Sequence, residues 1–155
     1  MLDPLRVEDA EEMASLLDDP GLHTYIGGVP AAVGELRDRY RRQVRGRSPD
    51  GSQRWLNWVV RRRDSGHAVG TVQATISLQD DTSVAEVAWV IAARYQRRGY
   101  ARESAAEMLR WLRQHGIGVV IAYVHPEHDA SIGVARALGL RATTRTRDGE
   151  VRWEA

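Results

Sequence analysis

The sequence predicts a mixed α/β (α+β) domain with a mostly antiparallel central sheet flanked by helices. Three strand-like segments separated by turn residues occupy residues 54–93. Before residue 100 the apolar side chains recur at every second residue. After it they recur about every 3.6 residues, which indicates a helix. A nearly continuous apolar run at 119–125 then indicates a buried parallel strand. A strand–helix–strand–helix unit is therefore inserted into an antiparallel sheet, and residues 1–155 are expected to form one domain.

The N-terminal half contains a short strand, two helices and an antiparallel meander. The second helix is amphipathic, because Val33, Leu36, Tyr40 and Val44 recur at helical spacing. The turn sequences DSGH and QDDTS separate the three strands of the meander. The expected elements are a strand at 2–7, helices at 8–19 and 31–47 with a loop at 20–30 between them, and strands at 54–63, 67–78 and 84–93.

The C-terminal half begins with an amphipathic helix. Its apolar face carries Ala101, Ala105, Met108 and Leu112, and glycines at 116 and 118 end it. A strand at 119–125, a second helix closed by Gly139 and a final hairpin at 141–155 follow. The Asp148-Gly149 pair marks the turn of that hairpin.

Composition excludes several kinds of chemistry. The chain has no cysteine, so disulfides, a thiolate nucleophile and cysteine-bound zinc are excluded. The net charge of +1 gives no general attraction to nucleic acid or to a membrane, so neither is expected as a partner. No apolar run approaches the roughly 18 residues of a spanning helix, and the acidic N-terminus lacks a signal region, so we expect a cytoplasmic protein. All 22 basic residues are arginine and phenylalanine is absent, which is typical of GC-rich bacterial coding.

The sequence YQRRGYA at residues 95–101 stands where a strand passes into a helix. The first turn of a helix leaves four N–H groups without partners, and Ser, Thr, Asp or Asn usually caps one of them. None of these stands at 98–100. Instead, Gly99 permits a sharp turn and close approach of a ligand, while Arg97 and Arg98 add positive charge to the helix dipole. The segment predicts a site for a phosphate or pyrophosphate; the alternative is a glycine-capped helix with two solvated arginines.

Residues 96–101 (QRRGYA) resemble the acyl-CoA pyrophosphate loop of the GNAT superfamily of N-acetyltransferases, whose pattern is Gln/Arg-x-x-Gly-x-Gly/Ala. A second segment is similar to the family signature N-x-x-S-x-x-V-x-x-x-x-G-F; its matching residues are His128, Ser131, Val134, Gly139 and Leu140. The order of expected elements also matches, and residues 2–17 resemble the branch that acetylates ribosomal-protein N-termini (RimJ/RimL type). The resemblance implies the GNAT fold, in which the sheet is splayed between its fourth and fifth strands.

The resemblance also implies that acetyl-CoA is the co-substrate, bound between the strands at 83–93 and 118–124. The pantetheine arm would pair with strand backbone at Val90, Ile91 and Ala92. The pyrophosphate would rest on backbone N–H groups, helped by a glutamine or arginine side chain. The loop residues implied are Gln96, Arg97, Arg98, Gly99, Tyr100, Ala101 and Arg102. A primary amine of a small molecule or of a protein N-terminus then attacks the thioester directly, which fits a chain without cysteine.

Glu86 is the candidate general base for this reaction. It is a lone acid in an apolar strand, on the face of Val84, Ala88 and Val90, and burial there would raise its pKa. The alternative is a glutamate that faces solvent or pairs with an arginine. A β-bulge, common in this strand of the family, would turn it to the other face.

The general acid is less clearly marked. Many family members have a tyrosine seven residues after the signature asparagine, but that position is Ala135 here. Ser131 resembles the serine that the ribosomal-protein branch places near the CoA sulfur; the alternative is a helix hydroxyl bonded to a nearby carbonyl. His128 replaces the asparagine and can still hydrogen-bond pantetheine. Tyr123 and His125 are further candidates for the acid.

Two rival classes of protein remain open. One is a non-catalytic acyl-CoA-binding module of the same fold, favoured by the two departures from the signature. The other is a nucleic-acid-binding domain that uses the arginine-rich stripe at 37–47, although such a stripe is more often a solvated helix face. The HPEHD cluster lacks the spacing of a helical zinc site, so no metal is expected. The acceptor determinants are expected in the loop at 20–31 and the helix at 31–46, and a homodimer is an option that the family allows.

Overall fold

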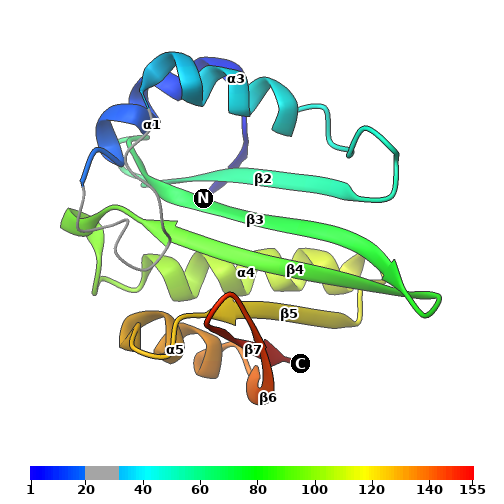
Figure 1. Cartoon of the computed structure of the whole chain (residues 1–155). Coiled ribbons are helices and arrows are strands. Elements are labelled where there is room, and N and C mark those ends of the chain that lie inside the picture. The colour runs from blue at the N-terminus through cyan, green and yellow to red at the C-terminus, as the bar shows by residue number, and fades with distance from the viewer. Residues whose placement is uncertain (20–31) are drawn as a thin grey trace.

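Seven strands join in one sheet in the computed structural model, which describes residues 1–19 and 32–155 (Figure 1). The strands are β1 (Leu2–Pro4), β2 (Arg54–Arg61), β3 (Ala68–Gln79), β4 (Thr82–Ile91), β5 (Val119–Val124), β6 (Arg141–Arg147) and β7 (Glu150–Glu154). Their order across the sheet is β1-β2-β3-β4-β5-β7-β6. All neighbours are antiparallel except β4 and β5, which are parallel. The predicted fold class is confirmed, and the predicted loop at 20–30 lies outside the described residues.

Four α-helices and two short 3-10 helices complete the described part of the chain. The helices are α1 (Ala10–Leu16), α3 (Val33–Gln43), α4 (Tyr100–Gln114) and α5 (Asp129–Ala137), and the 3-10 turns are η1 (Val7–Asp9) and η3 (Ala93–Tyr95). Helix α3 is shorter than predicted, because the chain leaves the helix at Val44, which is 45% exposed and does not join the apolar face. None of the described helices is long and apolar enough to cross a bilayer.

Helices pack on both faces of the sheet, and the apolar residues form two separate cores. Figure 1 shows how α1 and α3 are placed apart from α4 and α5. On one face, Met108 and Leu112 of α4 are fully buried against alternate residues of β3 and β4, such as Val72 and Val87. On the other face, α1 and α3 pack over β2 and β3 through Met13, Leu36 and Val59, among others. Alternation along the strands therefore sends every second side chain to each core.

One arginine fixes the N-terminal helix to the sheet. Arg61, near the end of β2, forms ion pairs with Asp3, with the buried Asp9 and with Glu12 at 3.0, 3.0 and 2.9 Å. A second oxygen of Glu12 accepts a hydrogen bond from the backbone N–H of Ala68 at 2.9 Å. These contacts hold α1 over β2 and β3, and Leu17, which directly follows α1, lines the smaller cavity described below.

Candidate active site

The sheet opens between β4 and β5 after only three paired positions. The parallel register runs from Val84↔Val119 to Glu86↔Ile121 and then stops, although β4 continues to Ile91 and β5 to Val124. Figure 1 shows the two strands diverging toward their C-terminal ends. Helices α4 and α5 begin just beyond those ends. The fork therefore has a wide mouth bordered by the starts of two helices.

The loop between β4 and α4 presents a row of unused backbone donors at the mouth of the fork. Arg97 and Gly99 both adopt the left-handed conformation, with φ of 64° and 86°. No acceptor in residues 1–19 or 32–155 takes a hydrogen bond from the backbone N–H groups of residues 97–102. Gly99 is the residue before α4 and offers no side-chain cap. The row lies at the positive end of the helix dipole, so it is suited to a multiply charged anion.

Side chains brace this loop from within. The Nε2 amide of Gln96 donates to the carbonyl oxygen of Ile91 at 2.9 Å and ties the loop to the end of β4. The guanidinium groups of Arg94 and Arg98 lie 5.2 and 5.8 Å from the ring centroid of Tyr95. Tyr95 in turn packs edge-on against Tyr100. The side-chain amide of Gln96 is thus occupied in holding the loop to β4. The arginine side chains of the loop are therefore better placed than Gln96 to bind an anion.

His128 and Ser131 lie together at the start of α5. Oγ of Ser131 is 3.4 Å from Nε2 of His128, which precedes the first residue of the helix. Burial lowers the pKa of His128, and the nearby His125 lowers it further. The imidazole is therefore neutral at pH 7, and the pair offers a hydroxyl and an uncharged ring nitrogen beside the end of β5. Ala135, where many family members have tyrosine, is fully buried.

Glu86 does not have the buried environment expected from the sequence. The register of β3 with β4 is unbroken, so no bulge turns Glu86 away from the face of Ala88 and Val90. Its side chain is nevertheless 38% exposed, and both carboxylate oxygens accept hydrogen bonds from Arg147, at 3.0 and 2.8 Å. The alternative expected from the sequence, pairing with an arginine, is what the structure contains. The reason is that β6 and β7, rather than an apolar helix, approach this part of the sheet.

Arg147 is a site residue that the sequence did not reveal. It ends β6 immediately before the predicted Asp148-Gly149 turn, and its guanidinium lies 3.8 Å from the ring centroid of Tyr123 in β5. The pairing with Glu86 raises the pKa of Arg147. Arg147 therefore connects β4 to β5 across the point where their ladder ends. Its position depends on β7 lying between β5 and β6, an order that no local pattern predicts.

A cavity of about 170 Å³ lies beside the fork, on the face covered by α1 and α3. Ala88 and Val90 of β4 line it just beyond the last paired position. The neighbouring strands contribute Asn57, Thr71 and Gln73. The described lining residues from the N-terminal segment and α3 are Leu5, Leu17, Leu36, Arg39, Tyr40 and Gln43. A molecule in this cavity would approach the fork from the face opposite α4.

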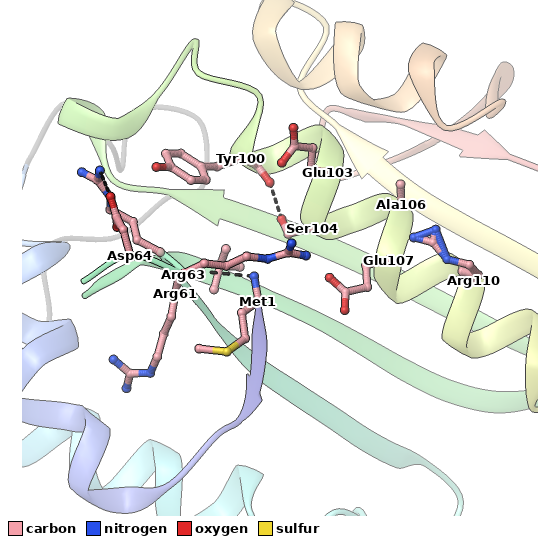
Figure 2. Close-up of a pocket in the computed structure, with 12 residues that line it drawn as sticks. Met1, Arg61, Arg63, Asp64, Tyr100, Glu103, Ser104, Ala106, Glu107 and Arg110 are labelled. Atoms are coloured by element: carbon pink, nitrogen blue, oxygen red, sulfur yellow. Dashed lines mark hydrogen bonds and ion pairs between the residues drawn. The ribbon is translucent and has the colours of Figure 1, made fainter. Parts of the chain in front are cut away.

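A larger cavity of about 630 Å³ lies on the other flank of α4, away from the fork (Figure 2). Glu103, Glu107 and Arg110 of α4 face Arg63 and Met1 from the other side of this cavity. Arg61 also borders it, but its guanidinium points away toward α1. Because β2 and β5 lie on opposite sides of β4 in the sheet, this cavity does not open into the gap between β4 and β5, although Tyr100 at the start of α4 also lines it.

The clustered acids and histidines do not form a metal site in the described ranges. No group of three or more His, Asp or Glu side chains within residues 1–19 and 32–155 is arranged to hold an ion. In the HPEHD segment, Nδ1 of His125 instead accepts a hydrogen bond from the backbone N–H of Glu127 at 3.0 Å.

A sheet that splits between two parallel strands, with a glycine-containing loop before a helix at the mouth of the split, is the arrangement expected of the class of acyl-CoA-dependent acyltransferases. Residues 1–141 match the family model of the acetyltransferase (GNAT) domain, so the chain belongs to the GNAT acetyltransferase family. It is therefore an acetyltransferase that uses acetyl-CoA, and the resemblance seen in the sequence is confirmed.

The individual proteins that resemble this chain share low sequence identity with it. The uncharacterized protein YkkB of Bacillus subtilis is 25% identical over 139 residues, which cover 81% of this chain and 71% of YkkB. A spermidine N-acetyltransferase from Vibrio cholerae, solved with CoA and spermine, has a TM-score of 0.76 at 17% identity, covering 99% of this chain and 92% of that one. A ribosomal-protein-alanine N-acetyltransferase from Brucella melitensis has a TM-score of 0.75 at 15% identity, covering 100% and 98%. At such identities the solved structures share the fold.

Proposed function

We propose that this protein transfers an acetyl group from acetyl-CoA to the primary amine of a small molecule or protein N-terminus. The observation that carries the proposal is the fork between β4 and β5, which ends at the N–H groups from Arg97 to Arg102, for which residues 1–19 and 32–155 supply no acceptor. Unpaired strand backbone can hydrogen-bond the amide groups of a pantetheine arm, and the N–H row can hold a pyrophosphate. A single elongated molecule that carries both an amide-containing arm and a pyrophosphate would occupy the gap between the strands and the N–H row at the same time.

The residues divide between holding the donor and assisting the reaction. Val90, Ile91 and Ala92 are proposed to align the pantetheine arm, although the N–H of Ala92 already donates to the carbonyl oxygen of Val69 and the carbonyl oxygen of Ile91 accepts from Gln96. Residues 97–102 are proposed to bind the pyrophosphate, with Gln96 bracing the loop. His128 and Ser131 are proposed to contact the arm or the thioester from the start of α5, where they lie 3.4 Å apart. Holding donor and acceptor in one orientation supplies much of the rate enhancement in a direct transfer.

The transfer requires that one proton is removed from the amine and that one proton is supplied to the departing CoA thiolate. The amine must be neutral when its nitrogen attacks the thioester carbonyl; the C–N bond forms, the C–S bond breaks, and the electron pair leaves with the CoA thiolate. Glu86 is proposed to accept the amine's proton through a water molecule, and Ser131 to donate to the sulfur. A carboxylate has about four acceptor positions, so the two used by Arg147 leave room for that water.

We expect Glu86→Gln to lower kcat by about 100-fold, the lower end of the usual contribution of a general base. Acetyl-CoA affinity should change little, because the side chain faces the α1 and α3 side of the sheet. Release of free CoA thiol with a panel of amines measures the first quantity, and calorimetric titration measures the second. Wild-type turnover across pH in the variant would refute the role of Glu86.

Glu150→Gln is the matched comparison. Burial raises the pKa of Glu150, which is close enough to Arg147 for their charges to interact. If turnover falls in Glu150→Gln but not in Glu86→Gln, Glu150 is the base. Acetyl-CoA binding without turnover on any amine would instead support the non-catalytic module.

We also propose that residues 1–155 act as one acyl-CoA N-acyltransferase domain in the cytoplasm. Strands from both ends of the chain belonging to one sheet support the first part, and acetyl-CoA being an intracellular metabolite supports the second.

A further inference from the structure

The cavity beside the fork has one positive charge and no negative charge among the described residues that line it. Its only charged lining residue in those ranges is Arg39 of α3. Residues 20–31, which are not described, contain no Asp or Glu in their sequence. No stretch of the chain that the structure leaves undescribed can therefore add a carboxylate to this cavity.

Two acids on this side of the sheet are already paired with arginines. Glu86 is bound by both nitrogens of Arg147, and the buried Asp9 is paired with Arg6 and Arg61. Burial raises the pKa of Tyr40 to about 12, so its phenol is uncharged at physiological pH. The remaining polar lining groups on the strands, Asn57, Thr71 and Gln73, are neutral.

The positive charge of the cavity disfavours the binding of a polyamine as the acceptor. After one amine is placed at the thioester, the other ammonium groups of a polyamine would lose water without gaining a carboxylate partner, and Arg39 would repel them. An acceptor with a single amine avoids this cost. The apolar side chains of Leu5, Leu17 and Leu36 favour an apolar body for that acceptor.

Arg39 is available to bind an anion. Its neighbours Arg37 and Arg41 on α3 form ion pairs with Glu11 and Asp38 at 2.8 and 2.7 Å. Arg39 has no ion pair within residues 1–19 and 32–155. A guanidinium at the rim of a cavity is well suited to grip a carboxylate through two parallel hydrogen bonds.

We propose that the acceptor is a small monoamine with an apolar body and a carboxylate, of the apolar α-amino acid class, whose carboxylate binds Arg39. The proposal deepens the transfer function above and depends on it. A cavity of about 170 Å³ has room for a small molecule, since each water occupies about 30 Å³ in the liquid. The neutral groups on the strands then contact the amine as it approaches the fork.

The test compares leucine, methionine and phenylalanine with their amides, with spermidine and with a tripeptide that has a free N-terminus. The wild-type protein should acetylate the amino acids with the highest kcat/KM. Arg39→Gln should raise KM for the amino acids about tenfold, and leave KM for their amides and the affinity for acetyl-CoA unchanged. Arg42→Gln is the matched control, because Arg42 is exposed on the same helix and does not line the cavity.

A second variant tests the charge argument in the opposite direction. Gln73→Glu adds a carboxylate to the cavity with little change in shape, and should raise kcat/KM for spermidine about tenfold while lowering it for the amino acids. Equal or better turnover of spermidine by the wild-type protein overturns the proposal, as does an equal effect of Arg39→Gln on acids and amides. If only spermidine or the tripeptide is acetylated, amine transfer stands and the acceptor class is wrong. If acetyl-CoA binds and no amine releases CoA, both proposals fail.

Discussion

We expect Gly99→Asp to weaken acetyl-CoA binding at least about 100-fold while the protein still folds. The new carboxylate would stand within the row of N–H groups at the start of α4. Two like charges about 4 Å apart repel by about 4 kcal/mol at an effective dielectric constant of 20, which corresponds to about three orders of magnitude in Kd. The fold should survive, because among the described residues a Cβ at this position meets just the carboxylate of Glu103, at the ordinary contact distance of 3.6 Å. Isothermal titration with acetyl-CoA gives the Kd, and circular dichroism checks the fold.

Two control variants separate charge from backbone strain. Gly99→Asn has almost the same shape as the aspartate variant without the charge, and both residues tolerate the left-handed conformation better than most. Gly116→Asp imposes a similar conformational strain at the other end of α4, where φ is 82°. We expect Gly99→Asn to weaken binding far less than Gly99→Asp, and Gly116→Asp to leave binding unchanged. An unaltered Kd in Gly99→Asp would show that the pyrophosphate binds elsewhere.

We expect Gly70→Ala to lower the free energy of unfolding by about 3 kcal/mol, the upper part of the usual range for an overpacked core. Gly70 of β3 is paired with Ile91 of β4. A Cβ at Gly70 would lie 2.1 Å from the carbonyl oxygen of Val90 and 2.9 Å from Cα of Ile91. Both are backbone atoms, so the end of β4 would have to move. Urea denaturation followed by tryptophan fluorescence measures the loss.

The variant also tests the role of β4 in donor binding. The displaced segment includes Val90 and Ile91, which we propose contact the pantetheine arm, so any folded Gly70→Ala protein should have a raised KM for acetyl-CoA. Gly34→Ala is the control, because a Cβ added at Gly34 in α3 would meet nothing within 4 Å, and alanine there should stabilise the helix by up to about 1 kcal/mol. Wild-type stability in Gly70→Ala would mean that β3 and β4 lie farther apart than the structure indicates.

Local patterns were enough to predict the fold and the position of the loop that precedes α4, for which phosphate binding stays a prediction. The change in apolar spacing after residue 100 located α4, and the apolar run at 119–125 identified β5 as the parallel strand, because both are properties of short segments. Gly99 could be singled out for the same reason: its left-handed φ and the absence of a side-chain cap follow from the residues around it.

The environment of Glu86 could not be predicted in this way. Its partner Arg147 is 61 residues away in the chain and reaches it only because β7 is inserted between β5 and β6. The sequence predicted the hairpin and its turn but contains no local information on which strand it joins. The sequence also could not show that Arg39 lacks an ion pair within the described ranges, since the pairing of the neighbouring Arg37 with Glu11 depends on how α3 lies against α1.

The fork has a consequence for how the protein behaves at high concentration. Unpaired strand edges invite pairing with other molecules and lead to aggregation. The outer edges of this sheet are poor templates, because β1 has three residues and β6 carries arginines at 141, 145 and 147. The part of β4 beyond its last pairing with β5, residues 87–91, is longer than β1, but it lies inside a wedge that closes at Glu86, with β5 on its other side. A thin ligand arm can enter such a wedge more easily than a whole strand with side chains on both faces. The chain thus keeps a hydrogen-bonding edge for its substrate while denying that edge to a second copy of itself.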